Sequence, residues 1–187
     1  MKYLLALLIS CNAFAVDFND PRVIVVYGKE SAGTAFSVIA PSGKVYLVTN
    51  AHVCDKDKEM AYREGDTPEI AVIIKINVST DLCIMASNKK EGFKIAQDYK
   101  RNESIQILGY PELVRSLFKG VLSGFIHNAE GFFLESPLAC KGGSSGSPML
   151  NSKDEVIGVV AMASMDPKRP DALAIPVIYL KEILKDL

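Results

Sequence analysis

The sequence predicts an all-β fold, either a barrel or a sandwich, that ends in one short helix. About a dozen short segments rich in β-branched and apolar residues follow one another, and turns that contain glycine or proline separate them. Only residues 179–187 have the apolar spacing of a helix, with Leu180, Ile183, Leu184 and Leu187 on one face. The chain is 49% hydrophobic and 23% charged, which is typical of a globular protein with a sizeable core.

The expected strands fall into two groups, which a polar connector at residues 88–103 separates. Residues 55–66, within the first group, are expected to form a charged, solvated loop. The first group comprises residues 23–27, 34–40, 44–49, 69–77 and 82–86. The second group comprises residues 104–110, 113–122, 131–134, 148–150, 156–163 and 173–178.

Residues 1–15 have the composition of a secretion signal. A basic start at Lys2 precedes an apolar run to Ile9, and Ala13-Phe14-Ala15 has the small-x-small form that signal peptidase accepts. We expect cleavage after Ala15, which makes residues 16–187 one secreted or periplasmic domain. The rival is a lipobox at Leu8-Ile9-Ser10-Cys11, which would anchor the chain through a lipid on Cys11. Both place the protein outside the cytoplasm, and no internal apolar run is long enough to span a membrane.

The composition argues against several classes of function. Lys and Arg number 21 and Asp and Glu 22, a net charge of −1 that does not suit a nucleic-acid-binding surface. The two histidines lie far apart, and neither a His-x-x-x-His nor a Cys-x-x-Cys spacing occurs. We therefore expect no metal and no other cofactor.

Three residues have the chemistry of an activated nucleophile. His52 follows an apolar strand, Asp81 opens another in Asp81-Leu82-Cys83-Ile84, and Ser145 lies in Gly142-Gly143-Ser144-Ser145-Gly146-Ser147-Pro148. A serine hydroxyl is a poor nucleophile until an imidazole takes its proton, and a carboxylate orients that imidazole and stabilises its cation. Glycines around the serine permit a turn that points backbone N–H groups at a developing oxyanion.

These motifs, in the order His, Asp, Ser, resemble those of the trypsin- and chymotrypsin-like serine proteases. The resemblance is closest to the short bacterial HtrA-type members without a PDZ domain. Thr49-Asn50-Ala51-His52 is similar to the family's Thr-Ala-Ala-His, Asp81-Leu82 to its Asp-Leu or Asp-Ile, and the Ser145 segment to its Gly-Asp-Ser-Gly-Gly-Pro. Other segments extend the resemblance over nearly the whole mature chain, namely residues 33–36, 107–111, 156–160 and 174–176.

The resemblance implies two six-stranded antiparallel β-barrels, split near residues 88–103, with the site in the cleft between them. His52 and Asp81 would come from the first barrel and Ser145 from the second. The oxyanion donors would be the backbone N–H groups of Gly143 and Ser145. The strand edge that pairs with the substrate backbone would be Ala161-Met162-Ala163.

Two positions depart from the family pattern. Ser144 replaces the aspartate that receives the new N-terminus in trypsin-like zymogens, so we expect no salt-bridge activation switch. Ser147 replaces the second glycine after the nucleophile.

Ala139, at the position of the acidic pocket base of trypsin, is uncharged, as are Ala161 and Ala163. This predicts a small or apolar side chain at the substrate residue whose carbonyl is attacked, the P1 residue.

Cys54 and Cys83 each lie two residues after a member of the expected triad. If His52 and Asp81 touch, the two cysteines can be close enough for a disulfide in an oxidising compartment. The sequence does not show where their Cβ atoms point, so a bonded pair and two free thiols both stay open. Cys140 would then be a small buried residue without a partner.

We therefore expect a secreted serine endopeptidase that acts on protein or peptide substrates. His52 is the general base and then the general acid, Asp81 orients it, and Ser145 is acylated. Activity needs a neutral imidazole, so it should be lost as the pH falls through about 6.5, where unperturbed imidazole titrates. The alternative is a catalytically silent protease-like module that binds extended peptides, and a third reading is an esterase on another fold.

Overall fold

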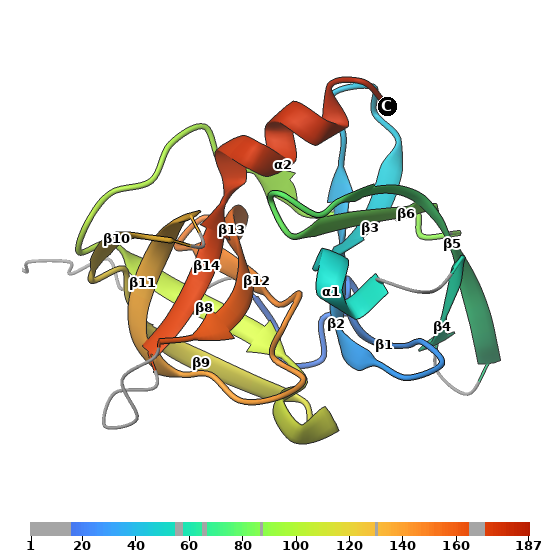
Figure 1. Cartoon of the computed structure of the whole chain (residues 1–187), viewed down its shortest axis with the longest axis horizontal. Helices are drawn as coiled ribbons and strands as arrows, with labels where there is room; N and C mark the ends of the chain where they lie inside the picture. Colours follow the sequence, from blue (N-terminus) through green and yellow to red (C-terminus); the bar gives the residue numbers. More distant parts are fainter. Residues whose placement is uncertain (1–15, 55–57, 65–66, 87, 130, 165–170) are drawn as a thin grey trace, which may run out of the picture.

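The first half of the chain forms a closed six-stranded barrel (Figure 1). The computed structural model describes residues 16–54, 58–64, 67–86, 88–129, 131–164 and 171–187. Antiparallel pairing runs in the order β1-β2-β3-β6-β5-β4, and β4 pairs back with β1. The elements are β1 (Val23–Tyr27), β2 (Ala32–Ile39), β3 (Val45–Thr49), α1 (Ala51–Cys54), β4 (Glu59–Glu64), β5 (Thr67–Asn77) and β6 (Leu82–Ala86).

The second half forms an eight-stranded sheet that curls beside the first barrel. Its order is β10-β11-β14-β13-β12-β8-β9, and the short β7 pairs with β13. A one-turn 3-10 helix at Pro111–Leu113 separates β8 from β9. The elements are β7 (Lys94–Ile95), β8 (Ser104–Gly109), β9 (Ser116–Val121), β10 (Gly124–Asn128), β11 (Gly131–Ala139), β12 (Pro148–Asn151), β13 (Glu155–Ala163), β14 (Asp171–Pro176) and α2 (Val177–Leu184).

The expectation of two six-stranded barrels is therefore right for the first sheet and wrong for the second, which is not closed. The ladder of β11 shifts register between Ser136 and Ala139, and Pro137 between them has no N–H to donate. The hydroxyl of Ser136 donates instead to the carbonyl oxygen of Val121 on β9, at 2.9 Å. A side chain thus joins β9 to β11 where a closed barrel has a backbone ladder.

The loop expected at residues 55–66 is also wrong in part, because β4 occupies Glu59–Glu64 and completes the first barrel. Its inward side chains, Met60 and Tyr62, are almost fully buried, whereas Glu59, Ala61 and Arg63 are exposed. This alternation is that of a half-buried strand. The charged residues on its outer face give this strand the composition of a loop, so the sequence does not predict it.

Strand side chains pack into three apolar cores. Leu47 belongs to a core inside the first barrel and Val160 to one inside the second sheet. A third core lies between the two halves, where Phe36 and Val48 join Val159 in one cluster. Strands that bury both faces read as continuous apolar runs, which explains the uninterrupted Val-Tyr-Leu-Val of β3.

Helix α2 extends from the second sheet across to the first barrel (Figure 1). It begins two residues before the expected start, directly after the extended Pro176. Leu180 and Ile183 are buried in the core between the two halves. Beyond its end, Tyr46 Oη of β3 donates to Leu187 O at 3.1 Å, and Lys75 of β5 pairs with Asp186 at 3.2 Å. The helix therefore ties the two halves together.

The expected cleavage site after Ala15 and the lipobox cysteine Cys11 lie outside the described residues. Within the described ranges, none of the helices has the length and apolar character that crossing a membrane requires.

Candidate active site

His52 lies on α1, a single helical turn that follows β3 at the rim of the first barrel. So short a helix is not stable alone, so tertiary contacts must hold it. Val53 and Cys54 are buried in the barrel core, and Ser31 Oγ donates to Val53 O at 2.7 Å. The imidazole of His52 remains half-exposed, with 50% of its side-chain surface accessible.

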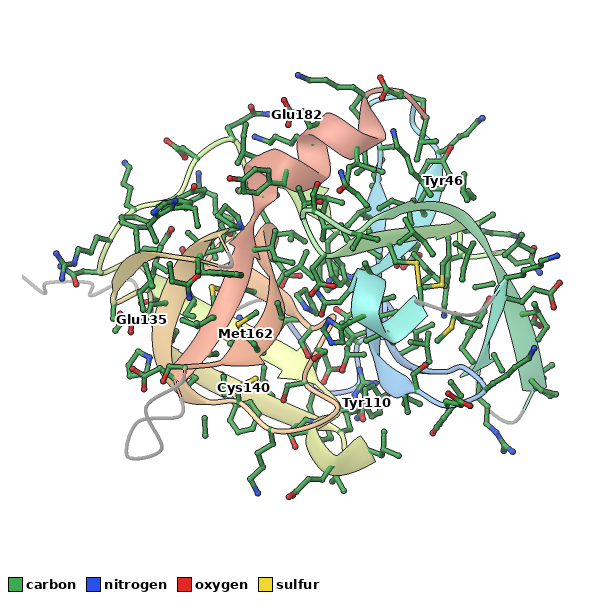
Figure 2. The ribbon with its side chains drawn as sticks, in the orientation of Figure 1. Tyr46, Tyr110, Glu135, Cys140, Met162 and Glu182 are labelled. Carbon is green, nitrogen blue, oxygen red and sulfur yellow. A yellow bond between two sulfur atoms is a disulfide. The ribbon has the colours of Figure 1, made fainter. Side chains whose placement is uncertain are left out.

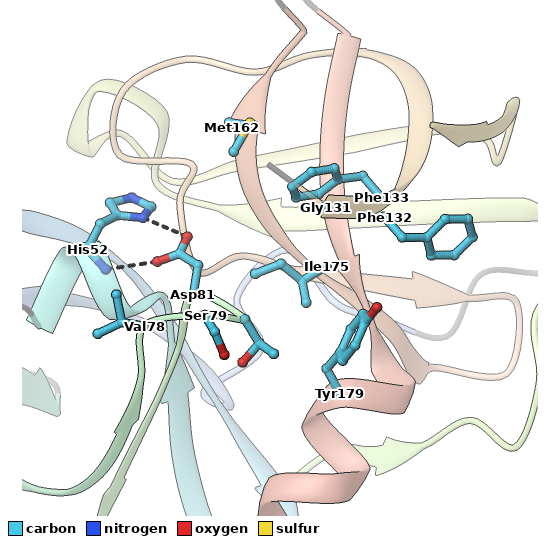
Figure 3. A pocket seen from close by; sticks show the side chains of 11 residues that line it. His52, Val78, Ser79, Asp81, Gly131, Phe132, Phe133, Met162, Ile175 and Tyr179 are labelled. Carbon is cyan, nitrogen blue, oxygen red and sulfur yellow. Dashed lines mark hydrogen bonds and ion pairs between the residues drawn. The ribbon is translucent and has the colours of Figure 1, made fainter. Parts of the chain in front are cut away.

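Asp81 binds His52 with both carboxylate oxygens (Figure 3). Oδ2 lies 2.8 Å from His52 Nδ1, and Oδ1 accepts the backbone N–H of His52 at 2.9 Å. Because an ionised carboxylate can only accept, Nδ1 carries the imidazole proton in this contact. Nε2 of the neutral ring then has a free lone pair, which is what a general base needs.

The turn before β6 presents this carboxylate. The amide oxygen of Asn77 accepts from Ser79 Oγ at 2.7 Å and from the N–H of Thr80 at 3.2 Å, which is typical of an Asx turn. Asn50 Nδ2 donates to the backbone oxygen of Asp81 at 3.0 Å. Asp81 itself has a left-handed φ of 51°, a conformation that persists where surrounding contacts fix it.

Ser145 lies on the loop between β11 and β12, and the first barrel holds this loop. Thr34 on β2 donates its backbone N–H to Ser145 O at 2.9 Å and its hydroxyl to Gly143 O at 2.8 Å. Gly143 and Gly146 have φ values of 88° and 85°, which favour glycine. A side chain at Gly146 would collide with Thr34 O and with Thr49 Oγ1, so only glycine allows this approach to β2.

The same packing places Ser145 beside the helix that carries His52. A Cβ atom added to Gly33 would lie 3.0 Å from the Val53 side chain and 3.1 Å from Ser145 O. Gly33 therefore lies between Val53 and Ser145 in a space that is tight for any side chain. The hydroxyl of Ser145 donates to Ala161 O at 3.1 Å. Across the described ranges, no hydrogen bond joins it to His52. The structure pairs Asp81 with His52 and brings Ser145 close to Val53, the residue that follows His52, but the serine–histidine contact is not made.

Two backbone donors beside the hydroxyl are unused. Among the described residues, the N–H groups of Gly143 and Ser145 donate no hydrogen bond within the chain. The segment at Tyr110–Leu113 supports this loop from outside (Figure 2): Glu112 N–H donates to Gly142 O at 2.6 Å. Glu112 and Leu113 both have left-handed φ, at 52° and 62°. Sequence reasoning missed this support because left-handed backbone at such residues leaves no compositional signal.

The expected substrate-binding residues lie on two strands, Ala139 on β11 and Ala161–Ala163 on β13. Ala161 has no paired residue on β14, because the β13–β14 register shifts between Val160 and Met162. Bulges of this kind are common next to active sites. Ala163 pairs with Ala172, and Ala139 pairs on the other side of β14, so β14 separates these two alanines.

Asp171, the first residue of β14, is a charged neighbour of these alanines that sequence reasoning missed. It pairs with Ala139 and is only 6% exposed. No motif surrounds it, and only the strand register brings it close. Asp171 does not line the pocket to which Ala139, Cys140 and Ala172 belong, so an uncharged P1 pocket stays a prediction.

A pocket of about 300 Å³ opens beside the imidazole (Figure 3). One wall consists of His52 and the turn at Val78–Asp81 from the first barrel. The opposite wall is largely apolar and comes from the second sheet and α2: Gly131, Phe132, Phe133, Met162, Ile175 and Tyr179. A pocket with the imidazole of His52 on one side and apolar side chains on the other suits a side chain of an extended peptide.

Cys54 and Cys83 form a disulfide with a Cα–Cα distance of 6.5 Å (Figure 2). The pairing that the sequence leaves open is therefore a bond. Cys140 is free and buried, as expected. Burial raises the pKa of the Cys140 thiol, against a smaller opposite effect of a hydrogen bond with Ser144. A thiol held in its protonated form is a poor nucleophile, so Cys140 is poorly suited to that role.

Comparison with known proteins shows the family and the fold. Residues 33–159 match the sequence family described as the trypsin-like peptidase domain. The fold is similar to an inactive form of the Rv3671c protein of M. tuberculosis, with a TM-score of 0.74 and 21% identity over 89% of this chain and 86% of that one.

Two further solved structures have the same fold. The S227A variant of the HtrA-type protease AlgW with a tripeptide has a TM-score of 0.79 and 21% identity over 94% of this chain. The serine endoprotease of Yersinia pestis has a TM-score of 0.74 and 17% identity over 91% of this chain. The matched regions span 62% and 66% of those two longer chains.

Proposed function

Because the chain belongs to the family of trypsin-like peptidases, we propose that it is a secreted serine endopeptidase that cleaves peptide bonds through His52, Asp81 and Ser145. The observation that carries this proposal is the pair of contacts between Asp81 and His52, at 2.8 and 2.9 Å. They fix the imidazole with its Nε2 lone pair free, beside a serine whose loop offers two unused backbone donors.

The reaction follows from these groups. His52 Nε2 takes the proton of the Ser145 hydroxyl as its oxygen attacks the substrate carbonyl. The N–H groups of Gly143 and Ser145 stabilise the oxyanion, and Asp81 stabilises the imidazolium. His52 then protonates the departing amine as the C–N bond breaks, which leaves an acyl-enzyme. Water, deprotonated by His52, hydrolyses the ester and restores Ser145.

Substrate binding supplies the contact that the resting site lacks. In the free protein the Ser145 hydroxyl donates to Ala161 O at 3.1 Å. An extended peptide that pairs with the edge at Ala161–Ala163 offers its own N–H groups to these carbonyl oxygens. Such a peptide competes with the hydroxyl for Ala161 O and releases it towards His52. Catalytic hydrogen bonds often form only in the substrate complex.

The disulfide supports a location outside the cytoplasm, because reducing compartments keep most thiols free. A signal that ends at Ala15 or a lipid anchor at Cys11 both agree with that location. For the P1 residue we retain a small or apolar side chain, with Ala139, Ala161 and Ala163 as the pocket residues. A peptide library with Arg or Lys at P1 tests this preference, and selective cleavage after those residues would assign Asp171 the specificity role.

A fluorophosphonate probe tests the proposed mechanism, because it reacts only with an activated serine in an assembled site. We expect the purified mature protein to be labelled at Ser145, and Ser145→Ala and His52→Ala variants to stay unlabelled. Intact-protein mass spectrometry gives the extent of labelling, and circular dichroism verifies the fold of each variant. A folded parent that does not react would contradict the mechanism.

The second candidate is a protease-like module that binds extended peptides without cleaving them. The hydrogen bond of the Ser145 hydroxyl to Ala161 rather than to His52 favours it. Fluorescence anisotropy with labelled peptides distinguishes the two functions, because the module predicts binding without either fluorophosphonate labelling or cleavage.

A further inference from the structure

The turn that carries His52 is attached at both ends to one residue, Cys83. On the N-terminal side, Thr49, the last residue of β3, pairs with Cys83 in the β3–β6 ladder. On the C-terminal side, Cys54, the last residue of α1, is bonded to Cys83 through sulfur. His52 lies between these two attachments.

Asp81 lies two residues before Cys83, at the start of the same strand. The carboxylate that binds His52 and the anchor of the His52 turn therefore belong to one short piece of backbone, residues 81–83. Any displacement of α1 relative to β6 changes the Nδ1–Oδ2 distance directly. The attachment through Cys54 opposes that displacement at the end of the turn that no strand pairing holds.

Among the described residues, few hydrogen bonds hold this end of the turn. The backbone of α1 beyond His52 is bonded through Ser31 Oγ to Val53 O, at 2.7 Å. The turn is too short to be stable as an isolated helix. Both sulfur atoms lie within the apolar core of the first barrel, with Cys54 and Cys83 fully buried. The disulfide therefore adds a covalent attachment to an end of the turn that apolar packing of Val53 and Cys54 also holds.

We propose that the Cys54–Cys83 disulfide is a positioning element of the active site. It holds His52 in its contact with Asp81, the position from which the imidazole accepts the proton of Ser145. The inference rests on the proposed serine peptidase function. Neither cysteine touches the substrate, and both act through His52. The general consequence is that loss of the bond slows acylation in molecules that remain folded.

The test compares Cys54→Ala/Cys83→Ala with the parent protein in rate of fluorophosphonate labelling, at a temperature well below both unfolding midpoints. We expect the double variant to react about 10- to 100-fold more slowly, since displacements of the order of 1 Å in a catalytic group have effects of this size. The matched control is Met85→Ala, which creates a cavity in the same core without touching the disulfide. It should lower the unfolding temperature and retain the parent labelling rate.

A double-mutant cycle separates positioning from general stability. Asp81→Asn is introduced into the parent and into the disulfide-free variant. If the disulfide acts through the His52–Asp81 contact, the substitution costs a smaller factor in the disulfide-free background. If the disulfide contributes only stability, both backgrounds lose the same factor, and the proposal is wrong.

A refilled variant, Cys54→Ala/Cys83→Val, keeps the comparison available if the alanine pair does not fold, because valine suits a strand and fills the vacated space. A folded disulfide-free variant that reacts at the parent rate overturns this inference and leaves the proposed function intact. A folded parent that does not react at all overturns the proposed function and this inference with it.

Discussion

Asp81 contacts both the ring and the backbone of His52, through Oδ2 to Nδ1 at 2.8 Å and through Oδ1 to the main-chain N–H at 2.9 Å. One carboxylate therefore sets both the rotation of the imidazole and the position of the turn beneath it. A substitution that keeps the second contact and changes the first separates these two roles.

Asp81→Asn is that substitution. An asparagine oxygen can still accept the backbone N–H, but the amide cannot stabilise an imidazolium as a carboxylate does. We expect a folded protein whose rate of acylation falls by about 10⁴-fold, the size known for this change in serine–histidine–aspartate sites. The extent of fluorophosphonate labelling, sampled at a series of times, gives the rate of acylation. Asp186→Asn, an exposed aspartate paired with Lys75, is the control and should react like the parent.

Gly146→Ala should abolish labelling. The residue has a φ of 85°, and a methyl group there would overlap Thr34 O and Thr49 Oγ1, which moves the Ser145 loop away from β2. Gly142→Ala is the matched control, because nothing lies within 4 Å of a Cβ atom at that position. Parent-like labelling of Gly146→Ala would show that the loop does not need its close approach to β2.

Val78→Asp should alter the choice of substrate without altering the chemistry. Val78 is 76% exposed on the wall of the pocket beside His52, so the change should not unfold the protein. Peptides with a large apolar residue just before P1 should lose about 10-fold in kcat/KM, while fluorophosphonate labelling is retained. Val121→Asp, an exposed valine on β9, is the control. An equal loss for peptides with glycine at that position would show that the pocket does not bind the side chain before P1.

The thiols give a prediction that depends on pH. Because burial raises the pKa of Cys140, less of its thiolate exists at a given pH than for a free cysteine. Iodoacetamide should therefore leave the native mature protein unmodified at pH 8, and reactivity should increase as the pH rises further. Denaturation without a reductant should expose one thiol, because Cys54 and Cys83 are bonded. Three modified cysteines under those conditions would contradict the disulfide.

The sequence predicts the strands best where a strand buries both faces. The continuous apolar runs of β3 and β6 predict strands directly, and β6 spans the expected residues 82–86. The opposite case is β4, whose outward Glu59 and Arg63 give it the composition of a loop. Strand β10 begins at Gly124 and is followed by Gly131, and because glycine favours turns, no strand is expected there. Local composition cannot report a pairing that depends on a partner strand far away in the chain.

The site divides along the same line. His52, Asp81 and Ser145 stand in short motifs whose residue types state their chemistry, so they could be proposed before any geometry was known. Asp171 and the Glu112–Leu113 support have no motif, and they become neighbours of the site only through strand register and a left-handed backbone. The direction of the Ser145 hydroxyl is a matter of one torsion angle, which no sequence pattern encodes.

The apolar core between the two halves has a consequence for how the protein fails on heating. His52 and Asp81 belong to one side of that core and Ser145 to the other, so their alignment depends on a seam rather than on either half alone. Warming that loosens this core by a fraction of an ångström would separate the proposed base, His52, from the proposed nucleophile, Ser145, while both sheets keep their ladders. Heat inactivation would then precede loss of secondary structure, and repacking side chains such as Phe36 or Val159 would tune the working temperature range.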